Sequence, residues 1–378
     1  MRVVIPLAGL GEAGGIKVLF KLADFLVEKG HDVTFIIIEG KDIYDKINIK
    51  TKATRIHIDI PPLLRIFSRW VFHAFIPAYL LYRAIPECDV VIANFWTTAY
   101  SVALSKKPKC KLYYCQAFEP SFYYHEYFYH LPIYKRILSH ISYRIFRFLS
   151  AQSYRLGLKM FANNAKIVRE IKSILGNKSI EIPIVPAGVD ITLYNTDGRK
   201  NSGKPVVGII VSPSFWKGSK YFFEGMVKLK ERGSSPFEIL CAFGPPPPGT
   251  PNVEAKWVKP KTQRELAEFY KSVDILVSPM ILTGEFPLPP LEGMACGCAV
   301  ISTNLIYGKS MENYYEIPPG DADAIADAVE ELLADECLRK KLQRNGLELA
   351  KQFAWENIYT KFMEMLTSFT AQKQEIIY

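Results

Sequence analysis

Carboxylates, prolines and glycines are concentrated in residues 284–297, which read GEFPLPPLEGMACG. The run before them, residues 274–280, is short and apolar, which predicts a buried parallel strand. Pro289 and Pro290 suit the first turn of a helix, where a backbone donor would have no partner. Such a helix directs amides and partial positive charge to the carboxyl edge of the sheet, where α/β proteins bind phosphates. Glu292, which we place in its first turn, either stabilises the helix dipole or accepts hydrogen bonds from ligand hydroxyls.

A second loop between a strand and a helix offers a cation. Residues 212–218 read SPSFWKG and follow the apolar run at residues 206–211. Lys217, next to Gly218, is either a solvated surface lysine or a phosphate contact. Its place after a predicted parallel strand favours the phosphate contact.

The glycines near the N-terminus allow a different chemistry. Gly9, Gly11 and Gly14 spell G-x-G-x-x-G after a predicted strand, and Glu39 ends the next one. This spacing is typical of a dinucleotide fingerprint and would indicate an oxidoreductase that uses NAD(P) or flavin. The glycines could also serve only a tight turn between a strand and a helix. The adjacent pair Gly14 and Gly15 allows a third interpretation, a loop that lies against a diphosphate.

Residues 284–297 resemble the donor-site motif of family 4 of the retaining glycosyltransferases, which usually reads EGFGLPPLEAMACG. The matching positions are Phe286, Leu288, Pro289, Pro290, Leu291, Glu292, Met294, Ala295, Cys296 and Gly297. One difference concerns the first glutamate of the motif, whose position is held by Gly284, with Glu285 one place later. The resemblance implies an α/β fold of the GT-B type, in which two doubly wound, Rossmann-like domains face a cleft. It also implies a nucleoside-diphosphate sugar as donor substrate, with no cofactor and no catalytic metal.

The same resemblance implies roles for individual residues. In the family, the G-G-x loop lies against the donor diphosphate, the lysine before the glycine contacts the phosphates, and the motif helix holds the nucleotide ribose and the sugar. Carried over to this sequence, the donor-binding residues are Gly14, Gly15, Lys217, Trp257, Val258, Glu285, Phe286, Pro287, Leu288 and Glu292. Trp257 and Val258, with Lys259, would cradle the base. The family's loop arginine is missing, because its position is held by Ser212.

Residues 114–123, YCQAFEPSFY, provide candidate acceptor contacts. They end a predicted strand, so Gln116 and Glu119 are expected at its carboxyl edge. The segment resembles the Q-D-x-E-P-x-F-Y sequence of some rhamnosyltransferases in the family, with Ala117 in place of the aspartate. We therefore predict Gln116 and Glu119 as acceptor-binding residues and Lys217, Glu292 and Gln116 as catalytic residues. The alternative for Glu119 is an ordinary loop carboxylate.

The chain has 378 residues and 49% hydrophobic content, which is enough for two or three packed cores. Strand and helix patterns alternate, with a polar, glycine-containing linker at residues 195–205. We predict an acceptor-binding domain over residues 1–200, a donor-binding domain over residues 201–356, and a final helix, residues 357–378, that packs on the first domain. The predicted strands are residues 2–6, 33–38, 56–60, 89–94, 111–117, 160–163, 180–185, 206–211, 237–243, 255–258, 274–279 and 299–303.

Neither the cysteines nor the paired aspartates indicate a metal site. The seven cysteines are scattered without the spacing of a disulfide framework or a zinc site, which favours a reducing cytoplasm. Asp321 and Asp323 mimic a D-x-D metal motif, but they follow Gly320 at the start of a helical pattern. We interpret them as helix-capping residues.

A net charge of +9 implies an anionic partner. Residues 128–169 contain no acidic residue, and their eight cations alternate with aromatic side chains. We interpret this segment as a basic aromatic helix that docks on an anionic membrane surface, although a helix with its basic face in water is the alternative. A nucleic-acid groove lacks any recognition motif, so no nucleic-acid partner is predicted. The longest apolar run, residues 70–82, is too short to span a bilayer.

The prediction is therefore a cytoplasmic glycosyltransferase, peripheral on the membrane face. It would move a sugar to a glycan or lipid-linked acceptor in cell-surface polysaccharide or glycolipid synthesis. The oxidoreductase is the alternative, and a phosphorylase or a binding protein on the same scaffold also stays open. The sequence does not identify the base, the sugar or the acceptor.

Overall fold

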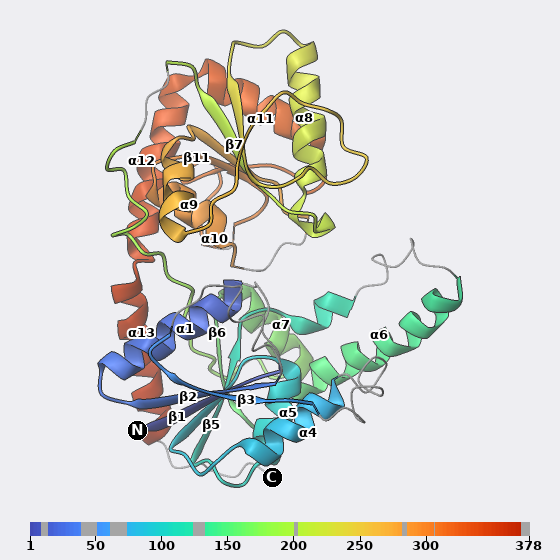
Figure 1. Cartoon of the computed structure of the whole chain (residues 1–378), viewed down its shortest axis with the longest axis vertical. Coiled ribbons are helices and arrows are strands. Elements are labelled where there is room, and N and C mark those ends of the chain that lie inside the picture. The colour runs from blue at the N-terminus through green and yellow to red at the C-terminus, as the bar shows by residue number, and fades with distance from the viewer. Residues whose placement is uncertain are drawn as a thin grey trace. The chain divides into compact units, whose positions relative to one another are not determined.

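The computed structural model describes residues 1–8, 14–38, 51–60, 74–123, 133–199, 203–281, 286–305 and 307–371. The chain forms two compact units (Figure 1). Unit 1 comprises Met1–Pro186 and Tyr359–Tyr378, and unit 2 comprises Ala187–Ile358. Each unit is built on a six-stranded sheet, and every pairing between its strands is parallel. The predicted fold class, with two doubly wound sheets, is confirmed.

The sheet of unit 1 has the strand order β3-β2-β1-β4-β5-β6. Because the order reverses between β1 and β4, the loops after these strands diverge and leave room for a ligand at the carboxyl edge. The strands are β1 (Arg2–Leu7), β2 (Asp32–Ile38), β3 (Thr54–Ile58), β4 (Val90–Ala93), β5 (Cys110–Cys115) and β6 (Lys159–Ala162). The helices are α1 (Gly14–Glu28), α4 (Phe75–Ala84), α5 (Trp96–Leu104), α6 (Ile133–Ser153) and α7 (Ala165–Leu175), with a 3-10 turn, η2, at Glu119–Tyr123.

Helices cover both faces of this sheet. Apolar side chains of α4, α5 and α7 form one core with alternate residues of the strands. On the other face lie α1 and α13 (Trp355–Ala371), the red helix in Figure 1. The ring of Tyr359 stacks on that of Phe25, with ring centroids 4.1 Å apart. The ring centroids of Phe362 and Phe161 are 6.2 Å apart. The last helix therefore packs on unit 1.

The sheet of unit 2 has the order β12-β11-β10-β7-β8-β9, which reverses between β10 and β7. Helices α8 and α11 cover one face, and α9, α10 and α12 cover the other (Figure 1). The strands are β7 (Val206–Val211), β8 (Glu238–Phe243), β9 (Lys256–Val258), β10 (Ile275–Ser278), β11 (Ala299–Ser302) and β12 (Tyr315–Glu316). The helices are α8 (Ser219–Glu231), α9 (Gln263–Lys271), α10 (Leu288–Ala295), α11 (Ala322–Ala334) and α12 (Glu336–Gln352), with a 3-10 turn, η4, at Phe215–Lys217.

Two expectations about local structure are wrong. Residues 180–185 form no strand, and only an isolated bridge joins Ile184 to Ala162. Residues 128–169 are not one helix, because their described part is divided among α6, β6 and the start of α7. The cations of that segment therefore do not share one face. Lys159, for example, lies in β6 and donates to the carbonyl oxygen of Phe369 at 2.7 Å.

Candidate functional site

Two loops meet at the carboxyl edge of the unit 2 sheet, where the strand order reverses. The turn after β7 ends at Gly218, whose φ is +71°. A Cβ atom there would overlap the carbonyl oxygen of Pro279, in the loop after β10, so this close approach requires glycine. The backbone N–H of Ile281 donates to the carbonyl oxygen of Trp216 at 2.9 Å. The loop that carries the half-buried Lys217 is thereby fixed against the chain that leads toward α10.

Helix α10 begins at Leu288, with Pro287 as its N-cap and a proline in its first turn, as predicted. Phe286 is 9% exposed and packs on Tyr307 and Phe353, with ring centroids 4.7 and 5.5 Å away. The carbonyl oxygen of Pro287 accepts a hydrogen bond from the Tyr307 hydroxyl at 2.9 Å. Because the Phe286 side chain is part of the core, it is the backbone at the start of α10 that can contact a ligand.

Glu292 lies in the second turn of α10, because the helix begins at Leu288. Its Oε2 accepts a hydrogen bond from the hydroxyl of Tyr270, on α9, at 2.8 Å. Glu292 is half-buried, whereas Tyr270 is fully buried. Burial, together with the nearby Glu292 carboxylate, raises the pKa of Tyr270 well above 10, so its phenol stays protonated and donates. No sequence motif indicated Tyr270, because its link to Glu292 exists only through the packing of α9 on α10.

Ser212 holds the position of the missing arginine and has a local role. Its N–H donates to Ser219 Oγ at 3.0 Å, and its Oγ accepts from the N–H of Ser214 at 3.2 Å. These bonds shape the turn after β7. Ser212 therefore supplies geometry rather than charge.

Trp257 and Val258, predicted to cradle a base, lie on the edge strand β9, 40% and 37% exposed. Successive residues of a strand point to opposite faces. Val258 lines a cavity of about 470 Å³ with residues of α9, while Trp257 lines another of about 330 Å³ with Phe223. The structure thus brings the two residues to different cavities, and their role with a base stays a prediction.

In unit 1 the structure brings Gln116 and Gly15 together. Gln116 follows β5, and a Cβ atom at Gly15, in the first turn of α1, would overlap Gln116 Oε1. Gln116 Nε2 is buried without a hydrogen-bond partner in the described part of the chain. Asn163 Nδ2 donates to the Gln116 carbonyl oxygen at 2.6 Å and fixes its backbone. Gly14 begins α1, whereas Gly9, Gly11 and Glu285 lie outside the described residues.

Glu119 is 2% exposed. Its Oε2 accepts from the N–H of Trp96, the first residue of α5, at 2.7 Å, and its Oε1 accepts from the Tyr113 hydroxyl at 2.9 Å. Burial raises the pKa of Glu119 to about 8, although both hydrogen bonds act in the opposite direction. The carboxyl group therefore anchors η2 to α5 inside unit 1.

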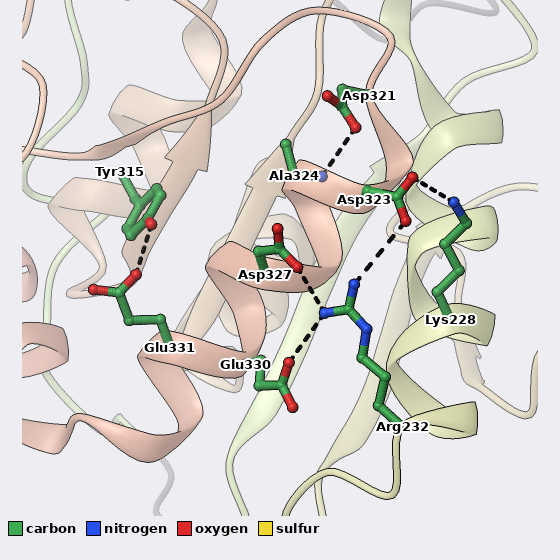
Figure 2. Close-up of polar contacts among 9 residues, drawn as sticks. All are labelled: Lys228, Arg232, Tyr315, Asp321, Asp323, Ala324, Asp327, Glu330 and Glu331. Atoms are coloured by element: carbon green, nitrogen blue, oxygen red, sulfur yellow. Dashed lines mark hydrogen bonds and ion pairs between the residues drawn. The ribbon is translucent and has the colours of Figure 1, made fainter.

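The aspartate pair at the start of α11 is explained by capping and ion pairing (Figure 2). Asp321 Oδ1 accepts from the N–H of Ala324 at 3.0 Å, which confirms the capping interpretation. Asp323 forms an ion pair with Lys228 of α8 at 2.6 Å. Within the described residues, no group of three or more histidine, cysteine, aspartate or glutamate side chains could hold a metal ion.

Two family models match the chain, one in each half. Residues 13–193 match glycosyltransferase family 4, and residues 204–335 match glycosyl transferases group 1. The chain belongs to these glycosyltransferases. The family models and relatives give no support to the oxidoreductase alternative.

Relatives with similar sequences are also glycosyltransferases. A D-inositol 3-phosphate glycosyltransferase of Corynebacterium urealyticum is 23% identical over 57% of this chain and 58% of its own length. An O-antigen chain mannosyltransferase B of Escherichia coli is 33% identical over 26% of each chain. The alignments thus span only about half, or less, of the relatives' length.

Solved structures extend the likeness of this glycosyltransferase to the whole fold. Sucrose-phosphate synthase from Thermosynechococcus elongatus has a TM-score of 0.73 at 15% identity, covering 98% of this chain and 100% of that one. Anabaena HepE, solved with UDP-glucose, has a TM-score of 0.70 at 15% identity, covering 97% and 99%. The two doubly wound units of the present chain therefore form a GT-B fold.

Proposed function

We propose that this glycosyltransferase moves a sugar from a nucleoside diphosphate to a hydroxyl of a glycan or lipid-linked acceptor, with retention at the anomeric carbon. One observation carries the proposal. The Lys217–Gly218 turn is joined to the Pro279–Ile281 turn at the edge of the unit 2 sheet, where strand order reverses. That edge is the usual ligand site of open α/β sheets, and it holds a cation and a helix N-terminus.

The residues at this edge suit the departure of a diphosphate. As the bond from the anomeric carbon to the phosphate oxygen breaks, its electron pair stays on the diphosphate. Lys217 and the backbone at Phe286–Leu288 stabilise that charge. The acceptor hydroxyl oxygen forms the new bond on the same face of the sugar, and its proton passes to the leaving phosphate. Glu292 accepts hydrogen bonds from the ribose hydroxyls of the nucleotide.

The similar structures support the choice of donor. HepE was solved with UDP, with UDP and glucose, and with UDP-glucose. The matching relatives include mannosyltransferases from Escherichia coli. A nucleotide sugar is therefore the donor class that we propose, with Gln116 and the start of α1 on the acceptor side.

Nucleotide binding tests the proposed function. We expect UDP, GDP, dTDP or ADP to raise the melting temperature, since a ligand that binds only the folded state stabilises it by mass action. Lys217→Ala should reduce that shift. Lys220→Ala, which changes an exposed lysine three residues later in α8, is the matched control. Stabilisation by NADH and by none of the nucleoside diphosphates would overturn the proposal.

We further propose that unit 1 binds an anionic membrane surface through α4 and α6. These helices both pack on α5, and their exposed faces combine large apolar side chains with arginines. The exposed residues are Phe75 and Tyr79 at 41% and 56%, Ile145 and Phe148 at 37% and 61%, and the cations Arg83, Arg144 and Arg147. Among the described helices, none has the length and apolar content needed to cross a bilayer.

Vesicle sedimentation tests this surface. We expect binding to vesicles that contain anionic lipid, weaker binding at high salt, and loss of binding in the double variant Tyr79→Ser and Phe148→Ser. Ile184→Ser is the control, because Ile184 is 43% exposed in unit 1 outside α4 and α6. Binding that salt does not change, or that the double variant retains, would contradict the proposal.

A further inference from the structure

The carboxylate of Glu292 is held by a buried hydroxyl group. Tyr270 Oη donates to Glu292 Oε2 at 2.8 Å, and the Tyr270 side chain is 0% exposed. A buried phenol with a single short bond to a carboxylate restricts how that carboxylate can turn. Glu292 is half-buried, so the same group is also accessible from outside.

The segment before β7 keeps Tyr270 and α10 in place. The ring of Tyr194 lies edge-on to Tyr270, with centroids 6.0 Å apart, and its hydroxyl donates to Gln263 Oε1 of α9 at 2.6 Å. Arg199 donates to the carbonyl oxygens of Cys296, which ends α10, and of Val273, both at 2.8 Å. The segment before β7 therefore contacts α9, the turn after α9 and the end of α10, and Tyr194 also bonds to the side chain of Glu292.

We propose that Tyr270 is a positioning residue that makes the nucleotide site select ribose over 2′-deoxyribose. The inference rests on the proposed function, in which Glu292 accepts hydrogen bonds from ribose hydroxyls. An ionised carboxylate is an acceptor only, with capacity for about four hydrogen bonds, and the side chains of Tyr270 and Tyr194 both bond to it. With the carboxylate fixed, a missing 2′-hydroxyl cannot be compensated by rotation. The deoxynucleotide therefore leaves acceptor capacity unfilled beside a ligand that displaces water.

The prediction is a difference in discrimination rather than a loss of binding. Affinities are measured for UDP with 2′-deoxy-UDP and for GDP with 2′-deoxy-GDP. In the unmodified protein we expect the ribose form of the bound nucleotide to be preferred roughly tenfold, since a site that hydrogen-bonds a hydroxyl rejects the analogue without it. In Tyr270→Phe the preference should fall to about two- or threefold, because the carboxylate loses its buried donor and keeps only the contact with Tyr194.

A second pair of tyrosine and glutamate in unit 2 provides a matched control. Tyr315 of β12 donates to Glu331 Oε2 of α11 at 2.6 Å (Figure 2). Tyr315→Phe removes the same type of hydrogen bond away from α10, so it should leave the preference for ribose unchanged. A general loss of rigidity in unit 2 would instead lower the preference in both variants and overturn the proposal.

Two further variants keep the inference testable. If Tyr270→Phe does not fold, Glu292→Asp withdraws the carboxylate from Tyr270 by one methylene group and should lower the preference in the same direction. In Glu292→Gln, addition of Tyr270→Phe should have no further effect on the preference, because the two residues act through one contact. A ratio that Tyr270→Phe leaves at its original value overturns the role of Tyr270 alone. Selective binding of dTDP, which has no 2′-hydroxyl, would overturn the preference for ribose. Binding of no nucleoside diphosphate, ADP and dTDP included, would overturn the proposed function itself.

Discussion

Glu119 of unit 1 and Glu292 of unit 2 have similar hydrogen-bond partners and different exposure. Each lies beyond a strand at the carboxyl edge of its sheet, and each accepts a hydrogen bond from a buried tyrosine hydroxyl. Glu119 also accepts from the N–H of Trp96 and is 2% exposed, whereas Glu292 is half-buried. Internal donors therefore satisfy both oxygens of Glu119. We therefore expect a ligand to contact Glu292, which the fold leaves accessible, and not Glu119.

The carboxyl edges of the two sheets also differ in the charge of the groups that they present. The edge of unit 2 presents Lys217 and the start of α10, which can stabilise a leaving anion. At the described edge of unit 1, the groups that meet are neutral, namely the Gln116 amide and the backbone of Gly15. We therefore expect substitutions in unit 2 to change turnover, and the substitution of Glu119 to change stability.

Of the substitutions that test this difference between the units, Lys217→Ala should have the largest effect, on turnover. We expect turnover to fall by about 10²- to 10³-fold, since removal of one electrostatic donor to a developing anion typically has this effect. Donor affinity should fall less, because negative charge on the diphosphate grows as the glycosidic bond breaks. Steady-state kinetics with the nucleotide sugar identified by melting experiments provides the measurement. Unchanged turnover in a variant that still binds nucleotide would show that another cation fills this role.

The fold could largely be predicted, because runs of apolar residues alternate with helical patterns along most of the chain. The loops with Lys217 and Pro287 were predictable for the same reason, since each follows a buried strand. Contacts between distant segments were not. The amide that binds Glu119 comes from Trp96, and the hydroxyl that binds Glu292 comes from Tyr270, and neither has a local pattern.

Composition alone also misled in one segment. Residues 128–169 contain no acidic residue, which suggested one basic helix, although a strand was predicted at residues 160–163. The structure has that strand, β6, and the start of a second helix within the segment. A charge pattern does not show where the backbone turns. Helix α4, with exposed aromatic side chains, and helix α6, with exposed arginines, both pack on α5, and no local pattern in the sequence predicts this packing.

Glu119→Ala should have the next largest effect, on stability. It removes the acceptor for Trp96 N–H and the Tyr113 hydroxyl and leaves both donors buried, which we expect to destabilise the protein by about 2–4 kcal/mol. Urea unfolding followed by circular dichroism measures the free energy of unfolding. Glu181→Ala, an exposed glutamate of unit 1, is the control and should change it by less than about 0.5 kcal/mol. Equal effects of the two variants would remove the structural role of Glu119.

Glu292→Gln should lower nucleotide affinity and leave stability nearly unchanged, the reverse of Glu119→Ala. The amide keeps the shape of the side chain but has half the accepting capacity, so nucleotide affinity should fall by about 1–3 kcal/mol. The melting temperature without ligand should change little, because the amide oxygen can still accept from Tyr270. Isothermal titration and thermal melting separate the two quantities. Wild-type affinity in a folded variant would contradict contact between Glu292 and the ribose.

The smallest effect that we expect is a gradual change of the free energy of unfolding with pH. The pKa of Glu119 is raised from 4.5 to about 8 in the folded chain, chiefly by burial. Between these values the folded chain binds one more proton than the unfolded chain, so the stability that Glu119 contributes is fully present below pH 4.5 and declines as pH rises through about 8. The decline should approach about 1 kcal/mol per pH unit within this window.

Glu119→Gln isolates this slope, because the amide imitates the protonated carboxyl group and does not titrate. The titratable groups that face Glu119 are Tyr113, Tyr154 and Cys115, and burial raises the pKa of each well above its ordinary value, so they stay neutral below pH 9. His31, whose pKa is lowered by burial, titrates alike in both proteins and cancels in their difference. Urea unfolding at pH 5.5, 6.5, 7.5 and 8.5 should show wild type losing stability relative to Glu119→Gln at each step. Parallel curves would mean that Glu119 is ionised throughout, with its charge held by the donors of Trp96 and Tyr113.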